Sequence, residues 1–124
     1  MINHKKRILI IDDEEAMLFG FTKVLQSPNL QIDTAQTLEN TKHLIVENKY
    51  HVIIADMRLT NSTGMEGLEI IEFAKKRQPD CKIIILTAYG EKDTMEKVHE
   101  LGADFYFEKP VSPKNIKEII DTLK

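Results

Sequence analysis

Five short apolar runs alternate with five amphipathic segments along this chain of 124 residues. The runs are rich in Ile, Val, Leu and Phe, and their short length is typical of buried strands. The pattern predicts strands at residues 8–11, 30–35, 51–55, 82–86 and 105–107. Between them, apolar residues recur at intervals of three and four, as they do in amphipathic helices. The pattern predicts helices at residues 14–27, 38–48, 67–78, 93–101 and from residue 113 onward.

Turn-forming residues support these boundaries. Pro28 ends the first predicted helix and Pro79 ends the third, because proline cannot continue a helix. Gly102 stands where a helix C-cap belongs. Ser112 followed by Pro113 is typical of a helix N-cap and first turn.

Strict alternation of strands and helices predicts an α/β fold with a parallel sheet. The strands are almost unbroken in Val, Ile and Leu, which indicates burial under helices on both faces. Right-handed crossovers then favour a doubly wound, five-stranded parallel sheet of the flavodoxin-like (βα)5 type, with strand order 2-1-3-4-5. In that order the first and third strands flank the point where ligands bind in such sheets.

The length of the chain suits one domain, and no repeat, low-complexity tract or linker interrupts the pattern. We expect residues 1–124 to form a single domain, with no output domain in this chain. Met1 favours a natural N-terminus. Twenty acidic and 17 basic residues give a net charge of −3, without the basic excess that indicates nucleic-acid binding.

No apolar stretch approaches the roughly 20 residues that span a bilayer. The basic residues 4–7 are followed by too few apolar residues to form a signal peptide. We therefore expect a cytoplasmic protein. The single Cys81 fits a reducing compartment, and we expect it to be a packed thiol.

Polar groups follow the predicted strands. Asp12 and Asp13 come after the first strand, Asp56 after the third, Thr87 after the fourth and Lys109 after the fifth. The carboxyl ends of parallel strands share one edge of the sheet, so we expect these side chains to meet there.

Three adjacent carboxylates raise one another's pKa, and a divalent cation offsets their repulsion. Mg²⁺ suits this set because it prefers oxygen ligands and often shares a phosphate oxygen. A carboxylate such as Asp56 can also be the nucleophile that accepts a phosphoryl group. The Thr87 hydroxyl would donate a hydrogen bond to that group, and the Lys109 ammonium would neutralise it.

Each residue also has a purely structural interpretation. Asp12 or Asp13 can cap the first helix, and we expect one of them to do so as well. Asp56 and Thr87 can be turn residues, and Lys109 can be a surface lysine. The five together, at the ends of four predicted strands, favour the phosphoryl site.

With these residues, the chain resembles the receiver domains of two-component response regulators, of the chemotaxis-regulator type. The resemblance covers Arg7 to Leu123. The motifs that carry it are Asp12-Asp13 after ILII, Asp56 after VIIA, Thr87-Ala88 after IIIL and Lys109-Pro110 after FYF.

The resemblance implies that Asp56 accepts a phosphoryl group from a histidine kinase, a histidine phosphotransfer protein or a small acyl phosphate. It implies a Mg²⁺ site formed by Asp12, Asp13, Asp56 and the backbone carbonyl of Arg58. Such a domain is a phosphoacceptor that catalyses its own phosphorylation and dephosphorylation, and is not otherwise an enzyme.

The resemblance also implies a conformational switch. Thr87 would contact the phosphoryl group and move toward it, Lys109 would pair with it, and Tyr106 matches the family's switch aromatic. The Lys109–Pro110 bond is expected to be cis. The surface formed by the fourth helix, fifth strand and fifth helix would then change its preference for a protein partner. Binding of nucleic acid or membrane by this domain is not expected, and dimerisation on phosphorylation stays open.

The loop after Asp56 departs from the family. Family members commonly have a proline four residues after the phosphoacceptor and a glycine about eight residues after it. Here Thr60 stands in place of the proline and Gly67 comes eleven residues after Asp56, so Thr60–Gly64 resembles a three-residue insertion. We expect this loop to affect access of the phosphodonor or the lifetime of the phosphoryl group, with a tolerated surface insertion as the alternative.

Two other functions were weighed. A phosphohydrolase of the haloacid-dehalogenase type needs a second Asp two residues after its nucleophile, where this chain has Arg58. A receiver-like interaction module that works without phosphate would not need all five site residues. The cognate kinase, the downstream target and membership of a longer protein cannot be read from the sequence.

Arg58 and Tyr89 lie two residues after Asp56 and Thr87, where family members flank the path of attacking water. We predict that Tyr89→Ala changes the lifetime of the phosphorylated domain, because the ring partly shields the acyl phosphate. The decay of the phosphoprotein, followed by intact mass, measures this lifetime. An unchanged decay rate would argue against shielding.

Overall fold

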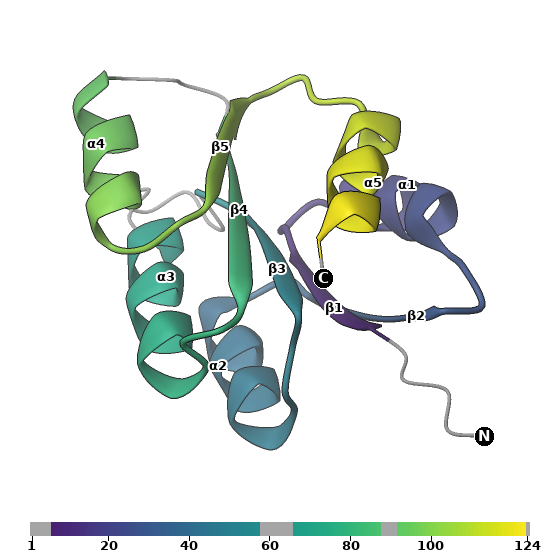
Figure 1. Cartoon of the computed structure of the whole chain (residues 1–124), viewed down its shortest axis with the longest axis horizontal. Helices are drawn as coiled ribbons and strands as arrows, with labels where there is room; N and C mark the ends of the chain where they lie inside the picture. Colours follow the sequence, from purple (N-terminus) through teal and green to yellow (C-terminus); the bar gives the residue numbers. More distant parts are fainter. Residues whose placement is uncertain (1–5, 58–65, 88–91, 124) are drawn as a thin grey trace.

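The computed structural model describes residues 6–57, 66–87 and 92–123. In these ranges five strands alternate with five helices (Figure 1), and their bounds lie within two residues of the predicted ones. The elements are β1 (Lys6–Ile11), α1 (Glu15–Leu25), β2 (Leu30–Ala35), α2 (Leu38–Glu47), β3 (Val52–Asp56), α3 (Glu66–Arg77), β4 (Lys82–Thr87), α4 (Lys92–Glu100), β5 (Phe105–Glu108) and α5 (Pro113–Thr122). Among the described helices, none has the length and apolar character needed to traverse a bilayer.

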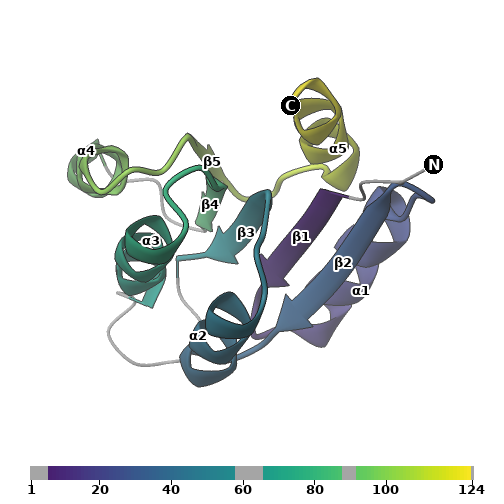
Figure 2. The ribbon, with the colours of Figure 1, turned by 60° about the horizontal axis from the view of Figure 1, so that its bottom comes forward.

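The five strands form one parallel sheet in the order β2-β1-β3-β4-β5, which confirms the predicted topology. The arrows of β1, β2 and β3 run in the same direction across the sheet (Figure 2). β1 lies between β2 and β3, and its last residue, Ile11, pairs with Ala35 on one side and Ala55 on the other. The carboxyl ends of these strands are therefore level with one another.

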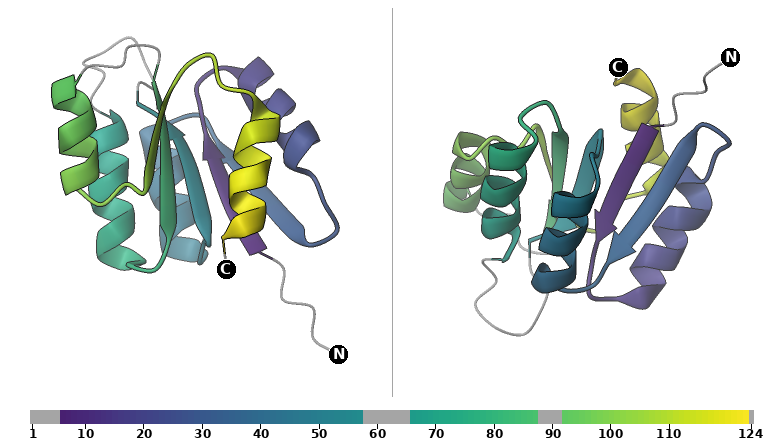
Figure 3. Two further views of the ribbon diagram at one scale, coloured as in Figure 1. Left: turned by 45° about the horizontal axis from the view of Figure 1, so that its top comes forward. Right: turned by 90° about the horizontal axis from the view of Figure 1, so that it is seen from below.

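Helices cover both faces of the sheet (Figure 3), as the unbroken apolar strands predicted. α1 and α5 lie on one face, and α2, α3 and α4 lie on the other. Alternate residues of β1 point to opposite layers: Ile8 and Ile10 belong to the α1/α5 core, whereas Leu9 and Ile11 belong to the α2/α3/α4 core. The central strand β3 is buried at all five positions, and β1 and β4 are buried from Ile8 and Ile83 onward, because both of their faces are covered.

The inner face of α1 is narrower than its sequence pattern indicated. Leu18, Phe21 and Leu25 are buried, but Val24, which shares their spacing of three and four residues along the helix, is 39% exposed. Leu25 occupies the position four residues after Phe21 and fills the contact with α5, so Val24 is turned toward solvent. Phe19 is more exposed still, at 67%.

The helix ends follow local hydrogen bonding. Glu14, not Asp12 or Asp13, is the N-cap residue of α1, and its side chain makes no capping bond, so the expected aspartate cap was wrong. Asp12 Oδ1 instead accepts a hydrogen bond from Glu14 N at 3.0 Å. Ser112 occupies the N-cap of α5 without a side-chain bond. Gly102 has φ 113°, the left-handed conformation that its C-cap position requires.

The Cys81 thiol is packed, as expected, with only 2% of the residue exposed. Burial raises its pKa to about 12, and the Lys75 ammonium offsets only part of this rise. A thiol with so high a pKa is protonated at neutral pH and is a poor nucleophile.

We predict that Gly67→Ala lowers the free energy of unfolding by about 1–3 kcal/mol, because a side chain here overpacks the interior. Gly67 N donates a hydrogen bond to Met57 O at 3.0 Å. A Cβ atom at position 67 would lie 2.8 Å from both Met57 Cα and Met57 Sδ. Urea unfolding followed by circular dichroism measures the loss.

Gly20→Ala is the matched control. A Cβ at Gly20 meets nothing within 4 Å, and the residue lies inside α1. Alanine at this helical position should raise the free energy of unfolding by about 0.5–1 kcal/mol. Equal effects of the two substitutions would show that the contact between Gly67 and Met57 is not tight.

Candidate functional site

Three carboxylates meet at the carboxyl edge of the sheet. Asp12 directly follows β1 and Asp56 ends β3, and the pairing of Ile11 with Ala55 brings these two aspartates level. Asp13 joins them, and one carboxylate oxygen from each of the three residues lies within 4.8 Å of the others. Asp12 and Asp56 are only 3% and 8% exposed, whereas Asp13 is exposed. The cluster therefore has two buried members and one at its mouth.

Lys109 supplies the opposite charge. Its Nζ lies 3.2 Å from Asp12 Oδ2 and 3.1 Å from Asp56 Oδ2, so one ammonium bridges both buried carboxylates. The backbone positions it, because Lys109 N donates to Thr87 O at 2.6 Å just beyond the pairing of β4 with β5. The Lys109–Pro110 bond is cis, as expected.

The charges in the cluster shift the pKa values of its members. Burial lowers the pKa of Lys109, but the charges of Asp56 and Asp12 and the hydrogen bonds to them outweigh burial, so the net shift is upward. Burial, followed by the charge of Asp12, raises the pKa of Asp13. Lys109 is therefore protonated and positively charged at neutral pH. It does not fully offset the electrostatic repulsion that Asp12 exerts on Asp13.

The raised pKa of Lys109 has a consequence for folding. The folded protein holds this proton more tightly than the unfolded chain, so the interaction stabilises the fold below the ordinary lysine pKa as long as the carboxylates of Asp12 and Asp56 are ionised. That contribution is lost as the pH rises through the folded-state value.

The predicted hydroxyl and aromatic residues lie on the neighbouring strands. Thr87 ends β4, is 3% exposed and pairs with Glu108 of β5. Tyr106 pairs with Ile85, and its partly buried ring packs against the core beneath α2, α3 and α4. The structure thus brings Thr87 to the edge that holds the aspartates and places Tyr106 further along the adjacent strand.

Some sequence predictions lie outside the described residues. These are Arg58 with its backbone carbonyl, the insertion Thr60–Gly64 and Tyr89.

The contact between Gly67 and Met57 was missed by sequence reasoning. Gly67 begins the buried face of α3 and packs directly on the residue that follows Asp56. The sequence did contain a signal. The glycine that family members have about eight residues after the phosphoacceptor corresponds here to Gly67, eleven residues after Asp56. This shift was interpreted only as a sign of a longer loop.

This arrangement suits a divalent cation and a phosphoryl group. The three carboxylates offer the oxygen ligands that Mg²⁺ and Ca²⁺ prefer, and Lys109 adds a positive charge within hydrogen-bond distance of the same oxygens. Asp56 contributes one oxygen to this cluster, and its Oδ2 lies 3.1 Å from the Lys109 ammonium.

Comparisons with known proteins agree with this geometry. The family model described as "Response regulator receiver domain" matches residues 8–121. Sporulation initiation phosphotransferase F of Bacillus subtilis is 32% identical over 100% of this chain and 94% of that protein. The photosynthetic apparatus regulatory protein RegA of Cereibacter sphaeroides is 28% identical over 90% of this chain. The chain spans only 59% of the length of that RegA protein.

Solved structures show the same fold. A CheY-like receiver domain protein from Methanospirillum hungatei superposes with a TM-score of 0.85 and 30% identity, over 94% of this chain and 91% of that one. A response regulator from Burkholderia pseudomallei gives a TM-score of 0.82 and 28% identity, over 97% of this chain and 67% of that one. The latter structure contains a phosphorylated aspartic acid, a calcium ion and citrate. This chain belongs to the response regulator receiver domains of two-component signalling.

Proposed function

We propose that Asp56 is the phosphoacceptor of this receiver domain and takes its phosphoryl group from a histidine kinase or a histidine phosphotransfer protein in a Mg²⁺-dependent reaction. The observation that carries this proposal is the Lys109 ammonium bridging Asp12 and Asp56 beside Asp13. The phosphorylated aspartic acid of the Burkholderia response regulator supports it.

The metal would be held by Asp12, Asp13 and Asp56, together with the backbone carbonyl of Arg58. The donor set fits, because three carboxylate oxygens lie within 4.8 Å of one another. A bound Mg²⁺ would offset the repulsion among the carboxylates and neutralise phosphoryl oxygens. The calcium ion of the Burkholderia structure supports a divalent cation, with magnesium as our assignment.

The chemical step is a phosphoryl transfer between two side chains. A carboxylate oxygen of Asp56 forms a bond to phosphorus, the phosphorus–nitrogen bond of the donor phosphohistidine breaks, and its electron pair returns to the imidazole. Lys109 lies 3.1 Å from Asp56 and would pair with the incoming phosphoryl oxygens. Thr87, at the same edge, would donate its hydroxyl hydrogen to another.

Phosphorylation would alter the surface formed by α4, β5 and α5. The added charge at Asp56 draws Thr87 and Lys109 toward new acceptor oxygens, and Tyr106 on the strand next to Thr87 responds by turning inward. Residues of this surface that the structure describes as exposed include Met95, His99 and Lys114. A protein partner that prefers one state of this surface would read the signal.

The phosphodonor would dock over α1. Phe19 is 67% exposed near the acidic end of this helix. It lines a hollow of about 740 Å³ together with Glu15, Thr22 and Ile32. Large exposed aromatics are frequent anchors of protein interfaces, and this one lies on the helix that follows Asp12 and Asp13.

We expect Lys109→Met to tighten Mg²⁺ binding roughly tenfold in the unphosphorylated domain, because the ammonium no longer competes with the metal for the oxygens of Asp12 and Asp56. Isothermal titration with MgCl₂ gives the Kd. Lys117→Met is the matched control, because Lys117 pairs with Asp121 on the same helix, at 3.4 Å, and not with the aspartate cluster. Unchanged or weaker binding by Lys109→Met would show that the lysine does not compete with the metal.

Acetyl phosphate with Mg²⁺ should add one phosphoryl group to the wild-type domain, detected by intact mass. Asp56→Asn should abolish the adduct, because an amide cannot attack phosphorus as a carboxylate does. A chelator should abolish it in the wild type, and Asp121→Asn, which changes an exposed carboxylate of α5, should keep it. Absence of an adduct from acetyl phosphate and from a phosphohistidine donor, with Mg²⁺ bound, would favour the interaction module that works without phosphate.

Phe19→Ala should slow phosphoryl transfer from a phosphohistidine donor protein about tenfold or more, by removing an anchor of the docking surface. Phosphorylation by acetyl phosphate should keep its wild-type rate, because a small donor does not use that surface. Val46→Ala, which removes an exposed side chain of α2, is the control. Equal slowing with both donors would mean that Phe19 acts on the site itself and not on docking.

A further inference from the structure

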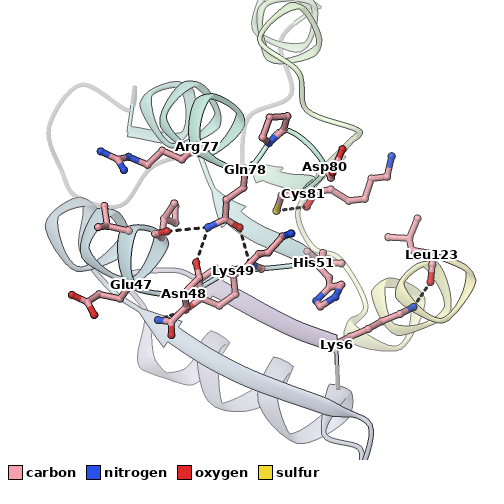
Figure 4. Close-up of a pocket in the computed structure, with 16 residues that line it drawn as sticks. Lys6, Glu47, Asn48, Lys49, His51, Arg77, Gln78, Asp80, Cys81 and Leu123 are labelled. Carbon is pink, nitrogen blue, oxygen red and sulfur yellow. Dashed lines mark hydrogen bonds between the residues drawn. The ribbon is translucent and has the colours of Figure 1, made fainter. Parts of the chain in front are cut away.

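A second cavity lies at the amino edge of the sheet, opposite the aspartate cluster (Figure 4). This basal pocket has a volume of about 660 Å³, within the range of small-molecule sites. It is bounded by the C-terminal ends of α2 and α3 and by the beginnings of β1, β3 and β4. Its polar lining residues are Lys6, Glu47, Asn48, Lys49, Tyr50, His51, Arg77, Gln78, Asp80, Cys81 and Lys82.

The backbone acceptors around the basal pocket are largely taken by the protein itself. Gln78 Nε2 donates to Ile45 O at 2.9 Å and to Asn48 O at 2.7 Å, so carbonyl groups at the end of α2 are covered. Lys75 Nζ donates to Cys81 O at 2.6 Å. Lys6 Nζ donates to Leu123 O at the end of α5. These four carbonyl oxygens already accept hydrogen bonds from side chains of the protein.

Donors, by contrast, remain available. The Lys49 ammonium makes no hydrogen bond or ion pair with any residue of the described ranges. His51 Nδ1 accepts a hydrogen bond from Arg7 N at 3.0 Å, so the neutral ring carries its hydrogen on Nε2. Lys49 and His51 lie near the middle of the pocket lining, while Arg77 extends away from it (Figure 4).

The charge of the lining points to the same class of ligand. Four Lys and Arg side chains and one His line the basal pocket, against the two carboxylates Glu47 and Asp80. Glu47 and Arg77 both point away from the centre of the pocket (Figure 4), which leaves three lysines and His51 against Asp80. The whole chain has a net charge of −3, so this basic excess is local. A concave basic surface concentrates anions.

We propose that the basal pocket binds a small anion whose phosphate or carboxylate group lies between the Lys49 ammonium and the Nε2–H of His51. The Lys49 ammonium is a charged hydrogen-bond donor and the His51 Nε2–H is a neutral one, and both can donate to an anionic oxygen. The site is separate from the aspartate cluster and does not depend on phosphorylation of Asp56, because it occupies the opposite edge of the sheet.

Amide chemical shifts of ¹⁵N-labelled protein test the proposal without magnesium. Pyrophosphate and citrate are titrated in separate arms, in EDTA and at constant ionic strength, to distinguish a phosphate ligand from a carboxylate ligand. Saturable shifts at residues 45–52 and 77–82, in at least one arm, are expected. Absence of saturable shifts there, or shifts confined to residues 12, 56, 87 and 109, would overturn the proposal.

Substitutions locate the contacts. Lys49→Gln and His51→Gln should each raise the Kd of the bound anion about tenfold, because each removes one of its donors. Lys76→Gln is the matched control: Lys76 is an exposed lysine of α3 outside the pocket lining, and its loss removes the same charge. Equal weakening by Lys76→Gln would mean that net charge alone attracts the anion and would refute a built site.

Urea unfolding of the same variants separates loss of binding from loss of structure. Lys49 makes no hydrogen bond or ion pair within residues 6–57, 66–87 and 92–123, so Lys49→Gln should unfold at the wild-type midpoint. If Lys49→Gln keeps both this midpoint and the wild-type Kd for the anion, Lys49 is not a donor to the bound anion. Phosphorylation of Asp56 by acetyl phosphate should proceed equally in all three variants, so the outcome is independent of the proposed phosphoacceptor.

Discussion

Two buried carboxylates placed level on adjacent parallel strands set the main constraint on this protein. Asp12 and Asp56 are almost inaccessible to solvent, and Asp13 adds a third charge beside them. Such a group is unfavourable without a cation. Lys109, more than 50 residues further along the chain than Asp56, supplies one by bridging both buried members. This ion pairing offsets part of the repulsion within the cluster and leaves oxygens that suit a divalent ion and a phosphoryl group.

The packing of the sheet holds these charges in place. The backbone fixes both sides of the cluster: Asp12 N donates to Ala35 O at 3.1 Å, and Met57 N donates to Leu86 O at 2.8 Å. Strands buried on both faces leave little room for a shift in register, because a slip of one residue would exchange the two cores. Gly67 closes the site from α3, where any larger side chain would meet Met57.

The two edges of the sheet differ in chemistry for a topological reason. Parallel strands end in the acidic cluster at the carboxyl edge, while α2 and α3 end at the amino edge with their carbonyl groups. Gln78 covers carbonyl groups at the end of α2, and basic side chains such as Lys49 and Arg77 surround that edge. One edge thus gathers acceptors for metal and phosphoryl chemistry, and the other gathers donors suited to an anion.

The sequence by itself determined the elements, the strand order and the positions of Asp12, Asp13, Asp56, Thr87 and Lys109 at one edge of the sheet, because local periodicity and strand-end chemistry are written in neighbouring residues. It did not reveal the N-cap at Glu14, the exposure of Val24, the contact between Gly67 and Met57 or the basal pocket. Only the tertiary structure decided these, and the sharing of Lys109 between two aspartates, because they depend on distances between segments far apart in the chain, which register and packing set.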